Sequence, residues 1–153
     1  LCYHPIYKNW SPVDAQPLVV ETNHGYVQSF SADCDQLTTL RVWGVDRNAP
    51  GAAALKIGLR DAASGQLIAL ERFGSAALPQ PGWLEFSFEP IPASKGSAYL
   101  LEANTAGEQP AAFSLYRSPT DEYPIGALTE NNAPLEGDLL FQFGCQAGFF
   151  HAK

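Results

Sequence analysis

Residues 53–73, AALKIGLRDAASGQLIALERF, decide the fold class of this chain. From Leu55 to Leu59, apolar side chains alternate with polar or small ones, which is the period of a strand with one buried face. The segment Asp61–Gly65 follows, and Gly65 can supply the positive φ that a tight reversal needs. Gln66–Phe73 is again typical of a strand. The stretch therefore predicts a β-hairpin.

Similar strand signals recur along the chain, each closed by Gly, Pro, Asn or Asp. Including the hairpin, we expect nine strands, at Pro17–Thr22, Gly25–Ala32, Leu37–Asp46, Ala53–Asp61, Gln66–Phe73, Trp83–Pro90, Ser97–Asn104, Ala112–Arg117 and Asp138–Gln146. No stretch shows a helical period, so the crossover helices of a parallel sheet are missing. We predict an all-β, antiparallel two-sheet β-sandwich of jelly-roll type. Ser118–Gly137 is expected to be a long loop.

Alternation within the strands also predicts the core, because one face of an antiparallel sheet is usually buried and the other wet. The expected core comprises Leu40, Val42, Leu55, Ile57, Leu59, Leu84, Phe86, Phe88, Tyr99, Leu101, Phe113, Leu115, Leu139, Phe141 and Phe143. By the same pattern Leu140 should lie on the wet face.

Length and composition limit the function classes. A chain of 153 residues suits a single domain, here 1–153, and the start at Leu1 with no methionine anywhere is typical of a fragment of a longer protein. The formal net charge is −7. We therefore expect no nucleic-acid partner, since phosphate binding needs a basic face. No apolar run is long enough for membrane insertion by this segment.

Cys2, Cys34 and Cys145 form an odd set without metal-binding spacing. One disulfide plus a free thiol suits an exported domain, and three buried thiols suit any compartment. The count leaves both alternatives open.

The chain has no recognisable catalytic motif. Cys34 lies between two aspartates, which should raise the pKa of its thiol and oppose nucleophilic chemistry. We therefore expect a protein that is not an enzyme. A glycoside hydrolase, which needs only two well-placed carboxylates, is the enzymatic alternative.

Calcium is the one metal that the acidic residues suggest, and no other cofactor is expected. Asp33, Asp35 and Asp138 stand at junctions between strands and loops, with Glu21 and Glu136 as further candidate ligands. Ca²⁺ prefers such carboxylate and loop oxygens. The alternative is that these aspartates simply form turns.

Aromatic side chains on wet strand faces give the main functional hypothesis. Trp43 shares a face with Arg41, and Tyr116 faces away from its apolar neighbours. A flat ring beside hydrogen-bonding groups can stack on a sugar. The predicted ligand-binding set is Trp43, Arg41, Tyr116, Tyr123, Asp121 and Asn131. Such rings also mark interfaces with proteins or with another domain.

Several phrases resemble a known group of domains. They are Gln28-Ser29-Phe30-x-Ala32-x-x-Asp35-x-Leu37-x-x-Leu40-x-Val42, Leu59-Arg60-Asp61-Ala62-Ala63-Ser64-Gly65, Trp83-Leu84-Glu85-Phe86-Ser87-Phe88-Glu89-Pro90-Ile91 and Gly137-Asp138-Leu139-Leu140-Phe141. Between Gly25 and Cys145 the chain resembles jelly-roll accessory domains of bacterial envelope proteins, similar to carbohydrate-binding modules with a galactose-binding-like fold. The phrases match core positions and carry over no binding residue.

The sequence thus predicts a non-catalytic accessory module that binds glycans on a bacterial surface or extracytoplasmic protein. The alternative is a structural or protein-interaction domain that packs against its parent chain. The resemblance allows that parent to be a membrane glycosyltransferase with this domain as its extracytoplasmic part.

Overall fold

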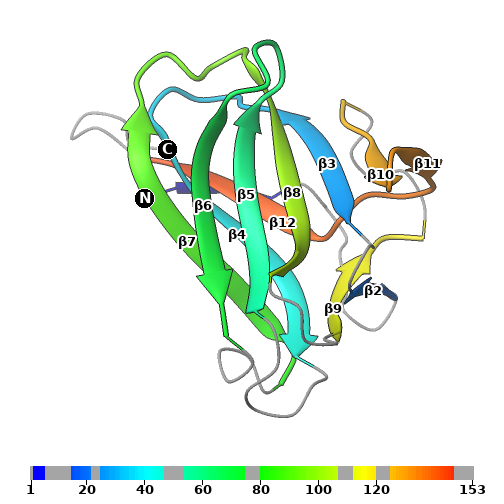
Figure 1. Cartoon of the computed structure of the whole chain (residues 1–153). Helices are drawn as coiled ribbons and strands as arrows, with labels where there is room; N and C mark the ends of the chain where they lie inside the picture. The colour runs from blue at the N-terminus through cyan, green and yellow to red at the C-terminus, as the bar shows by residue number, and fades with distance from the viewer. Residues whose placement is uncertain are drawn as a thin grey trace.

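The computed structural model describes residues 2–5, 15–21, 25–46, 54–74, 80–106, 112–119 and 125–146. Their regular secondary structure consists of strands (Figure 1). The strands are β1 (Cys2–Pro5), β2 (Gln16–Glu21), β3 (Tyr26–Ser31), β4 (Leu37–Asp46), β5 (Ala54–Asp61), β6 (Leu67–Phe73), β7 (Gly82–Ile91), β8 (Ala98–Ala106), β9 (Ala112–Arg117), β10 (Leu128–Glu130), β11 (Ala133–Leu135) and β12 (Phe141–Cys145). In this part of the chain no helix is long and apolar enough to cross a membrane.

The strands form two antiparallel sheets. The first sheet has the order β1-β12-β4-β9-β2, with β7 paired to the other side of β4. The second has the order β11-β10-β3-β8-β5-β6. In Figure 1 strands of the second sheet, β6, β5 and β8, run in front, and β4 and β12 of the first sheet pass behind them. The two-sheet sandwich predicted from the sequence is confirmed.

The connectivity is that of a jelly roll. Strands β2 to β9 pair as nested antiparallel partners: β2 with β9, β3 with β8, β4 with β7, and β5 with β6. Successive pairs alternate between the two sheets, so a long hairpin is wrapped into a sandwich of eight strands. Strands β10 and β11 extend the second sheet beyond β3, and β12 pairs with β4 in the first sheet and carries β1 on its other side.

All nine predicted strands are present, with ends shifted by up to three residues. The prediction was wrong about Ser118–Gly137, where β10 and β11 form a short hairpin that pairs with β3. Each of these strands has three residues, too few for a visible alternation. Pairing with β3 stabilises them, and the local sequence gives little sign of it.

The core lies between the sheets and contains the predicted inward side chains. All of them are buried except Phe88, which packs partly buried against the core. Leu140 corrects the expected pattern, because it is fully buried although alternation placed it on the wet face. It lies just before β12, where its carbonyl accepts from the Trp43 N–H at 3.0 Å and its N–H donates to the Tyr116 carbonyl at 2.8 Å. The Leu140 backbone is thus wedged between β4 and β9.

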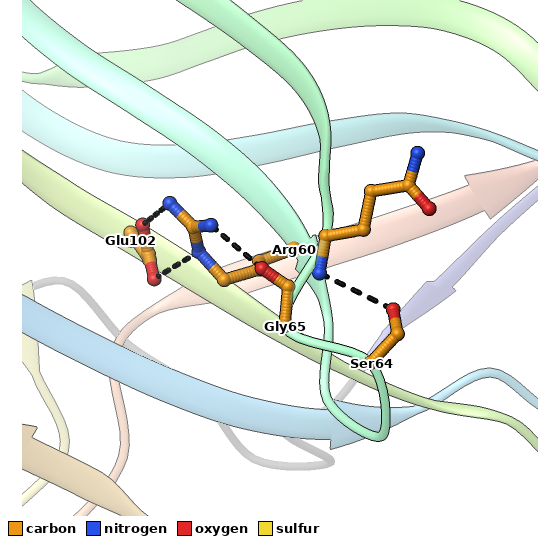
Figure 2. Close-up of polar contacts among 5 residues, drawn as sticks. Arg60, Ser64, Gly65 and Glu102 are labelled. Atoms are coloured by element: carbon orange, nitrogen blue, oxygen red, sulfur yellow. Dashed lines mark hydrogen bonds and ion pairs between the residues drawn. The ribbon is translucent and has the colours of Figure 1, made fainter.

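The predicted hairpin turn between β5 and β6 is confirmed. Gly65 has φ +75° and donates its N–H to the Asp61 carbonyl at 2.9 Å. Figure 2 shows Arg60 reaching from β5 to this turn and to Glu102 on β8. Its Nη1 donates to the Gly65 carbonyl at 2.7 Å, and its Nε lies 3.0 Å from Glu102 Oε2. One arginine therefore ties the turn to the neighbouring strand.

A disulfide joins Cys34, in the connection between β3 and β4, to Cys145 at the end of β12. Of the two alternatives that the sequence left open, the structure contains the disulfide. Because 111 positions separate the two cysteines, the bond fixes the end of the described chain to an early connection. A crosslink of this span restricts the unfolded chain more than the folded one.

Candidate functional site

Two tryptophans meet on the outer face of the first sheet. Trp43 on β4 lies directly opposite Trp83 on β7 in the antiparallel register. Their ring centroids are 5.2 Å apart and their planes are inclined at 81°, an edge-to-face contact. This is a favourable aromatic geometry, because the positive edge of one ring meets the negative face of the other. Both side chains are partly exposed.

Arg41 adds a positive charge to this pair. Its guanidinium carbon lies 4.5 Å from the centroid of the Trp83 ring, within cation–π range. Its Nε donates to Gln142 Oε1 on β12 at 2.6 Å, which orients the guanidinium across the sheet. Glu85 on β7 occupies the register position opposite Arg41 and is exposed. We call Arg41, Trp43, Trp83, Glu85 and Gln142 the tryptophan surface.

Local sequence explains why these side chains share one face. On β4, Leu40 and Val42 point into the core, so the alternating Arg41 and Trp43 must point outward. The same period applies to β7, where buried Leu84 separates Trp83 from Glu85. Pairing of β12, β4 and β7 then brings the outward residues together. The surface offers apolar rings together with a donor, an acceptor and a carboxylate.

The structure places the predicted ligand-binding residues unequally. Trp43 and Arg41 belong to the tryptophan surface. Tyr116 on β9 is partly exposed on the same sheet, and the backbone of Leu140 lies between it and Trp43. Tyr123 and Asp121 lie outside the described residues.

Asn131 belongs to the other sheet. It forms the β10–β11 turn with Asn132, and both have positive φ, 48° and 70°. Its Oδ1 accepts from the Gly25 N–H at 2.9 Å. Two consecutive residues with positive φ are the requirement of a tight hairpin turn, which asparagine tolerates well. The structure thus gives Asn131 a role in the turn and does not bring it to the tryptophan surface.

The three aspartates of the predicted calcium site are not grouped. Within the described part of the chain, no cluster of three or more His, Cys, Asp or Glu side chains could hold a metal ion. Asp33 and Asp35 are exposed, and Asp35 accepts from the Lys95 N–H at 3.1 Å. Asp138 is fully buried. Glu136 is exposed, and the side chain of Glu21 lies outside the described residues.

Asp138 instead joins a buried polar network between the sheets. Gln28, a fully buried residue of β3, donates its Nε2 to Asp138 Oδ1 at 3.1 Å, and its Oε1 accepts from the Leu139 N–H at 2.8 Å. Ser118 Oγ accepts from the Asp138 N–H at 3.0 Å. Buried polar groups need such partners, because an unsatisfied one costs about 1–3 kcal/mol. The network is therefore structural: it fixes the segment that leads into β12.

Sequence reasoning missed Trp83, Glu85 and Gln142. Alternation on β7 does place Trp83 and Glu85 on one outward face, which is a usable signal. However, that β7 lies beside β4 is not readable from either strand, because the β5–β6 hairpin separates them in sequence. Alternation correctly placed Gln142 on the other face of its strand from Phe141. Its approach to Arg41, however, follows from the register of β12 with β4.

Fold and site together define an all-β jelly-roll domain with an aromatic, arginine-containing surface on one sheet. No family model matches the chain, and no curated protein matches it. Among solved structures it is similar to one described as the cryo-EM atomic structure of broad bean stain virus, with 11% sequence identity and a TM-score of 0.33. That alignment covers 86% of this chain and 93% of the other. The jelly-roll assignment rests on the strand pairing.

Proposed function

We propose that this domain is a non-catalytic recognition module that binds carbohydrate on its tryptophan surface. The observation that supports this is the meeting of Trp43, Trp83 and Arg41 on one outer sheet face. An indole offers a flat apolar ring to the C–H face of a sugar, and neighbouring polar groups can pair with its hydroxyls. In this arrangement Arg41 is the donor, whereas Glu85 is an acceptor.

The geometry supports a shallow site that reads a few sugar units. The contributing side chains come from three adjacent strands and not from converging loops. A site of this kind buries little ligand surface, so we expect weak binding, with Kd between about 1 μM and 1 mM. Glu85 opposite Arg41 also makes the face mixed in charge. Neutral glycans fit such a face better than strongly anionic ones.

Tryptophan fluorescence tests the proposal directly, because two of the three tryptophans in the chain belong to the surface. We expect a saturable spectral change with a subset of neutral polysaccharides. Trp83→Leu should weaken binding at least about tenfold, a loss of about 1.4 kcal/mol. Phe73→Leu, an aromatic replacement on β6 of the other sheet, is the matched control and should bind normally. No response across a diverse glycan panel would overturn the proposal.

The same panel, run with calcium and with a chelator, tests the metal hypothesis separately. The aspartates are not grouped in the structure, so we expect equal binding in both conditions. Loss of binding on chelation would instead indicate a metal held elsewhere in the chain. That result would keep the glycan proposal and change its site.

A second candidate is supported by one contact at the same surface. Arg41 lies over one face of Trp83, so part of that ring is already covered. Trp and Arg are enriched at the centres of protein interfaces, so this face would also suit packing against the rest of a parent protein. Acrylamide quenching separates the two candidates. Indoles that quench equally well in the isolated domain and in a longer parent chain would exclude packing.

We also propose an extracytoplasmic location. The Cys34–Cys145 disulfide supports it, since such bonds persist mainly in oxidising compartments. Thiol counting on protein denatured in the presence of an alkylating reagent tests the proposal. Two fewer reactive thiols without reductant than with it would support export, and equal counts would contradict it.

A further inference from the structure

The free edges of the two sheets are protected unequally. Unpaired strand edges promote association with other strands, and proline is one of the residues that prevent it. Among the described residues, four strands with a free edge contain a proline: Pro5 on β1, Pro17 on β2, Pro90 on β7 and Pro134 on β11. The remaining one, β6, pairs only with β5 and contains none.

Strand β6 also exposes apolar side chains. Of the five large hydrophobic residues exposed in the described chain, three lie on β6: Leu67 at 43%, Ile68 at 38% and Leu70 at 44%. The Leu67 and Leu70 side chains both lie over Gly58, where an added Cβ would be 3.5 Å from each. The outer side of this edge is therefore an apolar strip. Such a strip on an edge without proline is a typical association surface.

We propose that β6 is a self-association edge, on which a second copy of this chain adds its own β6 antiparallel. The apolar strip supports a second copy as the partner, because the exposed Leu67 and Leu70 of one copy can continue those of the other, and the charges of the strand then limit the register. In an antiparallel pair, two directly opposed residues point to the same face of the sheet. A two-fold axis perpendicular to the sheet keeps each residue on its face, so the axis must pass through a residue and not between two residues. With Leu70 on the axis, the Leu70 side chains of the two copies meet on the outer side, and Ala69 faces Glu71 of the second copy. Moving the axis to Glu71 or Arg72 would place like charges directly opposite each other.

Two features of β6 limit the strength of this association. Ile68 is bulged out of register, because Ala69 pairs with Leu59 and Leu67 with Arg60. Glu71 lies opposite the buried Ile57, so its charge points toward the core side of the edge. A bulge and an inward charge both weaken edge pairing. We therefore expect a reversible dimer with Kd between about 10 μM and 1 mM.

Sedimentation velocity over a concentration series tests the dimer. The intact protein should shift from monomer toward dimer as concentration rises, and Leu70→Lys should weaken association at least tenfold by placing two ammonium groups at the axis. The control is Val19→Lys, which changes an exposed apolar residue on the proline-containing edge β2. It should leave the association unchanged. Both variants replace exposed side chains, and thermal unfolding checks that they remain folded.

Hydrogen exchange locates the interface. Amides of β6 should become more protected at high than at low protein concentration, and those of β2 should not. A monomer at every concentration would overturn the proposal and leave β6 as an edge for a strand of another protein. Equal weakening by Val19→Lys would also overturn it, because the contact would then not be at β6. None of these outcomes depends on glycan binding.

Discussion

Arg41 on the outer face of the first sheet and Arg60 on the outer face of the second have different partners. Arg60 on the second sheet bonds a carboxylate on the next strand and a turn carbonyl, so its donors serve the hairpin (Figure 2). Arg41 on the first sheet lies over an indole and bonds an amide oxygen. The Arg60 contacts hold the β5–β6 hairpin against β8. The Arg41 contacts hold a cation beside two aromatic rings, and the proposed glycan site depends on this arrangement.

The largest expected effect comes from a comparison of two glycines, one in each sheet. At Gly44 on β4, an added Cβ would lie 2.7 Å from Leu115 Cδ2 and 2.7 Å from the Ser114 carbonyl oxygen. At Gly58 on β5, the same atom would meet its nearest neighbours at 3.5 Å, an ordinary contact. Gly44→Ala should therefore lower the free energy of unfolding by about 1–3 kcal/mol, and Gly58→Ala by less than about 0.5 kcal/mol.

Urea unfolding followed by tryptophan fluorescence measures both glycine variants, with the slope m checked for a change in the unfolded state. The pair also sharpens the comparison of the sheets. If the first sheet is as tightly joined at β4 and β9 as the distances indicate, Gly44→Ala should also weaken glycan binding through the adjacent Trp43. Equal costs for the two glycines would contradict the close approach at Gly44.

The next effect concerns the arginines themselves. Arg41→Met removes a charge but retains an apolar chain, so glycan affinity should fall about tenfold, or about 1.4 kcal/mol. Its effect on unfolding should be smaller, about 0.5–1 kcal/mol from the lost cation–π contact. Arg60→Met should leave glycan affinity unchanged and lower the free energy of unfolding by a similar amount, about 0.5–1 kcal/mol, since its ion pair is partly exposed.

Glycan titration and urea unfolding, run on both arginine variants, form a two-by-two test. The comparison fails if Arg60→Met weakens binding as much as Arg41→Met does. It also fails if neither variant changes affinity, because the tryptophan surface would then not use its cation. The two substitutions are chemically identical, so a difference between them must come from their surroundings.

These two faces also show how much a sequence of this kind can reveal. The hairpin could be predicted because its signal is local: alternation from Leu55 to Leu59 and a turn that ends in Gly65. Two of the five residues of the tryptophan surface were predictable for the same reason, since Arg41 and Trp43 alternate with apolar residues on one strand and therefore share its outer face. Trp83 was not, because its neighbour on β4 lies far away in sequence and is set by the register of β4 with β7.

The acidic residues failed as a guide for a different physical reason. Asp is favoured at the ends of strands whether it binds a metal, caps a turn or joins a buried network. Asp138 has a turn-like sequence context, yet it is buried against Gln28, a residue 110 positions away. Burial and long-range hydrogen bonding are decided by the packing of the two sheets. The local pattern around Asp138 does not contain that information.

The smallest expected effect lies in the turn beside Arg60, at Asp61. Its Oδ1 accepts from the Ser64 and Ala63 N–H groups, each at 2.9 Å. The Ser64 backbone N–H is the main cause that holds the pKa of Asp61 below its usual value, against a smaller opposing effect of burial. Because the folded-state pKa is depressed, this stabilisation is present above the unfolded-state pKa of about 3.9 and is lost as pH falls through the folded value.

Asp61→Asn keeps an acceptor oxygen but cannot titrate. The stability advantage of the original protein over this variant should therefore be constant near neutral pH and shrink below about pH 4, as measured by urea unfolding. A difference that stays constant down to about pH 2 would contradict the role of the carboxylate charge and assign the turn to the shape of the side chain alone.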